Sequence, residues 1–145
     1  MSMRRNLLVV ALGITFLILM TWLGTIVTTI VPHRATARVQ TAQAGLYQVT
    51  LQVNPNPPPI THPATLAVQV LMRNSQQPVI NAHVTLESNM ETMDMGTDRS
   101  DAHLMPDGTY QASVQFTMSG PWQVQVHISA PNAPPATAPF EITAQ

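Results

Sequence analysis

Apolar and polar residues alternate along most of the chain after residue 45. In this pattern successive side chains point to opposite faces, which is typical of half-buried β-strands. Strands are therefore predicted within residues 46–53, 66–72, 82–86, 110–118, 122–128 and 138–143. No helical period interrupts them, so the pattern predicts an all-β domain, an immunoglobulin-like antiparallel β-sandwich of six to seven strands.

Two of these rows predict a β-hairpin. Residues 110–118 and 122–128 each carry an apolar row, and Ser119-Gly120-Pro121 between them is a tight-turn signal. Trp122 begins the second row and is expected in the core between the sheets.

The N-terminal part follows a different pattern, because no charged residue occurs from residue 7 to residue 31. As a helix this run is about 36 Å long, enough to cross a hydrocarbon core of about 30 Å. Residues 1–31 are therefore predicted to form a short cytoplasmic tail and a transmembrane signal-anchor helix in the lipid bilayer.

Basic residues do not decide the orientation of this helix, since Arg4 and Arg5 precede it and Arg34 and Arg38 follow it. A short positive tail before an apolar run is how a signal-anchor begins, so we expect a single-pass protein of a bacterial cytoplasmic membrane with an extracytoplasmic C-terminal domain. The alternative is a signal peptide cleaved after Ala42-Gln43-Ala44, but the apolar run is longer than such peptides have.

The segment that follows the run is small and polar without an apolar period. We therefore interpret residues 32–44 as a tether and residues 45–145 as the β-sandwich. The proline clusters at 55–63 and 131–139 suit loops and sheet edges, because proline cannot donate to a central ladder.

Composition excludes several functions. The 145-residue chain has no cysteine, so it forms neither disulfides nor thiolate metal sites. Only 9% of its residues are charged and its net charge is −1, which offers no basic patch for nucleic acid. No catalytic motif occurs in the sequence, so we expect no enzyme activity.

Methionine is concentrated in one segment. Met90, Met93, Met95 and Met105 lie close in sequence with His103 among them, and residues 89–96 are predicted to form a loop. Thioethers are soft ligands that suit Cu(I), and imidazole binds either copper state, so these five residues form a candidate copper site. In the alternative interpretation, Met93 and Met95 fill gaps under one end of the sandwich.

Other polar residues have simpler interpretations. Asp94, Asp98 and Asp101 do not have the spacing of a calcium-binding EF-hand loop and are expected in a solvated acidic loop. His83 and His127 are predicted on outward faces, where they could meet across strands.

Several segments together resemble a known family. A "G-x-Y" and "F-x-M-x-G-x-W-x-V" combination follows the methionine loop, and the region from Leu46 to Ile128 is similar to the YtkA-like domain family, to which the FixH-type oxidase-assembly proteins are related. The segments that carry the resemblance are residues 47–51, 65–72, 78–84, 90–96, 108–110 and 116–124.

The resemblance implies an immunoglobulin-like domain outside the cytoplasm, linked with copper handling or respiratory oxidase assembly. Met90, Met93 and Met95 match the family's methionine loop, although Glu91 stands where the family commonly has proline; His103 and Met105 lie outside the shared motif. Two functions stay open: a copper-binding assembly factor, and a metal-free accessory subunit of a respiratory or photosynthetic membrane complex.

Overall fold

The N-terminal unit of the chain contains a short helix. The computed structural model describes residues 11–22, 36–94 and 96–145, and the chain divides into two units, Met1–Arg34 and Ala35–Gln145. In the first unit residues 11–22 are helical, and no helix in the described residues is long and apolar enough to cross a membrane. The remainder of the predicted span lies outside the described residues, so the transmembrane helix stays a prediction.

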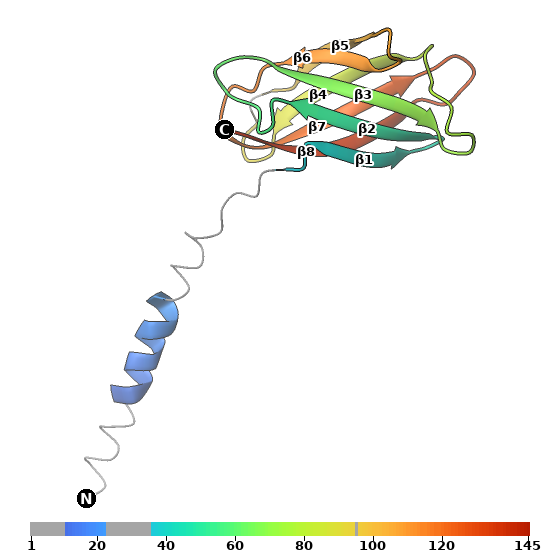
Figure 1. The fold of residues 1–145 in the computed structure, drawn as a ribbon. Coiled ribbons are helices and arrows are strands. Elements are labelled where there is room, and N and C mark those ends of the chain that lie inside the picture. Colours follow the sequence, from blue (N-terminus) through green and yellow to red (C-terminus); the bar gives the residue numbers. More distant parts are fainter. Residues whose placement is uncertain (1–10, 23–35, 95) are drawn as a thin grey trace, which may run out of the picture. The chain divides into compact units, whose positions relative to one another are not determined.

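The second unit is built from eight strands, and every paired neighbour is antiparallel (Figure 1). They follow the order β1-β2-β3-β6-β5-β4-β7-β8 in one nearly closed sheet. The strands are β1 (Val39–Ala44), β2 (Tyr47–Asn54), β3 (Ala64–Met72), β4 (His83–Met90), β5 (Asp98–Leu104), β6 (Tyr110–Val114), β7 (Gly120–Ser129) and β8 (Ala136–Ala144).

Side chains, rather than a backbone ladder, join the two edge strands. In the described residues β1 pairs only with β2, and β8 pairs only with β7. The Gln40 side-chain amide donates to the Glu141 carbonyl oxygen at 2.7 Å, and the Thr143 backbone N–H donates to the Thr36 hydroxyl oxygen at 3.1 Å. These bonds hold the sheet edges together.

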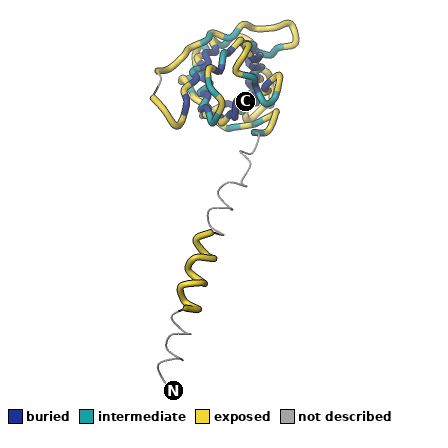
Figure 2. The backbone as a smooth tube through the Cα atoms, turned by 90° about the vertical axis from the view of Figure 1, so that its left-hand side faces the viewer, coloured by how far each residue is buried: buried dark blue, intermediate teal, exposed yellow. Residues whose placement is uncertain are grey.

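The core occupies the space inside the folded sheet, as the buried residues in Figure 2 show. In β2 the residues Tyr47, Val49, Leu51 and Val53 are all buried, whereas Gln52 between them is exposed. Trp122 is buried as predicted, and its ring meets that of Phe116 edge to face with centroids 5.4 Å apart. The alternation in the sequence therefore corresponds to alternation between core and solvent.

Two strands were missed by the sequence pattern, which predicted six or seven. Residues 39–44, which were assigned to the tether, form β1. Residues 98–104, where an acidic loop was expected, form β5. Their inward side chains are small or polar: Ala42 and Ala44 in β1, and Ser100 and Ala102 in β5. Such rows bury little apolar area and give no period of large residues.

The predicted hairpin is wrong. β6 pairs with β3 and β5, whereas β7 pairs with β4 and β8. Residues 115–119 leave the strand conformation, and Phe116 within them is buried, so the chain crosses the core instead of turning back on itself. A period of two reports which side chains are buried but not which strand lies alongside.

Replacing Leu51 by alanine tests the position of the core. Leu51 is fully buried, so its truncation should lower the free energy of unfolding by about 2–5 kcal/mol. The control is Leu46→Ala: Leu46 is half exposed, and its truncation should change stability by about 0.5 kcal/mol or less. Urea unfolding of the full chain measures both, and equal losses would contradict the assigned register.

Candidate functional site

The predicted methionine loop begins where β4 ends, beside β7 and β8. Met90 is the last residue of β4 and lies opposite Trp122, which in turn lies opposite Ile142. The backbone N–H of Glu91 donates to the Pro121 carbonyl oxygen at 3.2 Å, which holds the start of the loop against β7. We call this part of the β domain, residues 90–94, 118–122 and 142–145, the methionine end.

The chain enters the β domain at the same place. Thr36, at the start of the described part of this unit, accepts the backbone N–H of Thr143, the residue after Ile142. The Asn56 side-chain amide also donates to the Thr36 carbonyl oxygen at 2.9 Å. Thr36 therefore lies at the methionine end of the domain.

Met90 is mainly a core side chain rather than a loop residue. It is only 8% exposed and belongs to the core cluster. A Cβ added at Gly120 would lie 2.9 Å from the Met90 methyl carbon, so that methyl group packs directly on the glycine backbone. The absence of a side chain at Gly120 leaves room for Met90, and the prediction of a loop from residue 89 onward places the strand end too early.

Met93 has the opposite environment, because 53% of it is exposed. It lines an open cavity of about 270 Å³ together with Asn89, Met90, Glu91, Thr92 and Asp94. A residue exposed to this extent does not fit the alternative in which Met93 fills a gap under one end of the sandwich. Met95 lies outside the described residues.

His103 and Met105 do not join this cavity. β5 begins with Asp98 opposite Ser88, near the methionine end, and runs away from it. Five residues of strand, about 16 Å at 3.3 Å per residue, separate Asp98 from His103. Met105 lies still farther along, in the turn to β6, where its carbonyl oxygen accepts the Gly108 N–H. The structure therefore separates two predicted ligands from Met90 and Met93.

Met118 lies at the methionine end and was not among the predicted ligands. Its side chain is partly buried against the core, and its carbonyl oxygen accepts the Trp122 indole N–H at 2.9 Å. The only signal in the sequence was its place in the "F-x-M-x-G-x-W" segment. Periodicity instead assigned it to a strand.

The outward acids and histidines pair across strands. Asp98 and Asp101 lie in β5 rather than in an acidic loop. The His83 Nε2 atom lies 3.6 Å from an Asp101 carboxylate oxygen, and the His127 Nε2 atom lies 3.0 Å from a Glu87 carboxylate oxygen. The two histidines thus each face a carboxylate.

The cavity combines soft and hard potential ligands. Met93 supplies a thioether, and the exposed carboxylates of Glu91 and Asp94 supply negative charge that attracts cations. One Asp94 oxygen accepts the Gly96 N–H at 3.3 Å. Across residues 11–22, 36–94 and 96–145, no three His, Asp or Glu side chains are grouped as metal ligands.

Comparison with known proteins identifies the domain. The model of the family described as YtkA-like matches residues 40–127, which span the strands from β1 to most of β7 and include the whole methionine loop. Among curated proteins, none matches this sequence.

Oxidation by hydrogen peroxide should distinguish the two described loop methionines. Met93 should form the sulfoxide well before Met90, because about half of Met93 is exposed whereas Met90 is buried. Peptide mass spectrometry at successive times measures both rates, and the same reaction in urea is the control in which they should converge. Equal rates in the folded protein would show that Met90 is not a core residue.

Proposed function

Because the chain belongs to the YtkA-like family, we propose that it is a membrane-anchored, non-enzymatic domain that handles copper outside a bacterial cytoplasmic membrane. The observation that carries the proposal is the cavity at the methionine end, which is lined by the half-exposed Met93 together with Glu91 and Asp94. In this proposal the protein holds Cu(I) and passes it on during assembly of a respiratory complex. The relation to FixH-type proteins stays a prediction.

Sulfur provides the affinity and the carboxylates provide the local charge. Met93 is the exposed ligand. Met95, which also matches the methionine loop of the family, is the second ligand. Met90 lines the cavity from the core side and is the third sulfur within reach of the loop. A thioether is a soft ligand, so binding through sulfur favours Cu(I) over harder divalent cations.

A fixed support under a short loop suits transfer of a metal ion. The loop starts from a strand end that is paired with β7 and packed on Gly120, so its first residue is held in place. Met93 itself is exposed, which leaves it accessible to a partner's ligands. Ligand exchange then needs movement of the loop but not of the β domain.

Two parts of this proposal concern the setting of the domain. Each residue of helix 11–22 is exposed, and the uncharged run extends beyond it from residue 7 to residue 31, which supports a membrane anchor.

The nearly closed sheet supports an immunoglobulin-like sandwich in which β1, β2, β3 and β6 form one layer. β4, β7 and β8 form the other layer, and β5 pairs with both β4 and β6.

A second candidate function is a metal-free accessory subunit of a respiratory or photosynthetic membrane complex. The burial of Met90 and the distance of His103 and Met105 from the cavity favour it, because they leave Met93 as the single exposed methionine among the described residues that line the cavity. In that case the methionine loop would contact a partner through its apolar side chains rather than through a metal.

Anaerobic titration of the full chain with Cu(I), in competition with a chromophoric chelator, tests the first function. We expect one copper per chain, and Met93→Leu should weaken binding by at least about tenfold, since even residues behind the ligands contribute 10–100-fold to metal affinity. Met105→Leu is the matched control and should bind as the unchanged protein does.

The same titration separates the two functions. Copper binding that Met93→Leu leaves intact would contradict the assigned site. Absence of stoichiometric binding, together with extraction of the protein in a stable metal-free complex, would favour the accessory subunit.

A further inference from the structure

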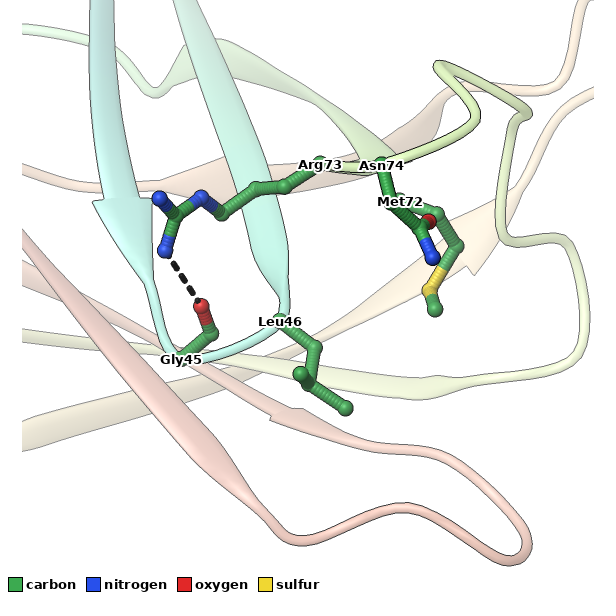
Figure 3. A pocket seen from close by; sticks show the side chains of 5 residues that line it. All are labelled: Gly45, Leu46, Met72, Arg73 and Asn74. Carbon is green, nitrogen blue, oxygen red and sulfur yellow. Dashed lines mark hydrogen bonds between the residues drawn. The ribbon is translucent and has the colours of Figure 1, made fainter.

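A second cavity lies at the turn between β1 and β2, away from the methionine end (Figure 3). Its volume is about 310 Å³, and it is lined by Gly45, Leu46, Met72, Arg73 and Asn74. Ligand pockets begin at about 300 Å³, so this one accommodates a group about the size of one amino-acid residue.

Hydrogen bonds hold the walls of this cavity in place. The Arg73 backbone N–H donates to the Leu46 carbonyl oxygen at 2.9 Å, which ties the β3–β4 loop to the β1–β2 turn. The Gln76 backbone N–H donates to the Met72 carbonyl oxygen at 2.8 Å, and its side-chain amide donates to the Arg73 carbonyl oxygen at 3.1 Å. Gly45 has a φ of +55°, a conformation that glycine adopts without strain.

The charge of Arg73 is not neutralised within the described part of the chain. There, Arg99 pairs with Glu87, whereas Arg73 has no acidic partner. One Nη1 hydrogen of Arg73 is donated to the Gly45 carbonyl oxygen at 3.1 Å, the bond drawn in Figure 3. A guanidinium has five N–H donors, so enough remain to bind a carboxylate through two parallel hydrogen bonds.

Apolar side chains line the same cavity as this cation. Leu46 is half exposed and Met72 is partly buried, and Figure 3 shows both side chains at the cavity together with the Asn74 amide. A cavity lined by an unneutralised guanidinium, a half-exposed leucine and a partly buried methionine is complementary to a ligand that carries both a carboxylate and an apolar group.

We propose that this cavity binds a carboxylate with a small apolar substituent, as found at the C-terminal residue of a polypeptide or in a short-chain carboxylic acid. Arg73 binds the carboxylate, Leu46 and Met72 contact the substituent, and Asn74 offers an amide to a neighbouring polar group. The site is independent of copper binding, because it shares no residue with the methionine end.

Saturation-transfer NMR of N-acetyl-leucine with the full chain in zwitterionic-lipid nanodiscs tests this proposal. We expect saturable binding of the free acid and at least tenfold weaker binding of N-acetyl-leucinamide, since tenfold corresponds to about 1.4 kcal/mol and a hydrogen bond to a charged group contributes at least that much. Arg73→Gln should cause a similar loss. Arg38→Gln removes the same charge at the other end of the domain and should bind like the unchanged protein.

Further arms identify the source of the carboxylate and guard against misfolding. Leu46→Ala keeps the guanidinium but removes apolar contact surface. It should therefore weaken the binding of N-acetyl-leucine and leave the binding of acetate unchanged. Tighter binding of a tetrapeptide acid ending in leucine than of hexanoate assigns the site to polypeptide C-termini, and the reverse order assigns it to free carboxylic acids. Equal binding of acid and amide, retention of binding in Arg73→Gln, or absence of saturable binding by any carboxylate would overturn the proposal.

Discussion

Burial of one side of every major strand is the constraint on which the β domain depends. In β2 the inward row includes Val49 and Leu51, and a shift of one residue would place Gln48 and Thr50 in the core instead. The cost of burying those amide and hydroxyl groups without partners defines the register strongly. Because the register is defined, the positions of strand ends and of the loops that follow them are defined as well.

The two environments of methionine at one end of the domain follow from this register. Met90 is the last member of an inward row in β4 that includes Val84 and Leu86, so it is drawn into the core. The strand ends there, and Met93, released from the alternation, is exposed. Met90 in the core and Met93 in solvent, three residues apart, therefore line the same cavity.

Strands with rows of large apolar residues, such as β2, β3 and β7, could be predicted from the sequence. β1 could not, because its inward positions hold Ala42 and Ala44, and neither could the partners of β6, because alternation does not encode which strand is adjacent. For the candidate site, the position of Met93 in a loop was predicted from the sequence, whereas the exposure of its side chain was left open, and the separation of His103 from it depends on the direction and length of β5. The cavity at Arg73 depends on how the β1–β2 turn packs against the β3–β4 loop, and no local sequence motif predicts that packing.

The proposed binding of copper by sulfur at the methionine end can be measured by X-ray absorption at the copper edge of the Cu(I)-loaded full chain. We expect thioether sulfur in the first coordination shell, and loss of that sulfur signal when Met93 is replaced by leucine. A first shell of nitrogen and oxygen alone, or a sulfur signal unchanged by that replacement, would contradict it.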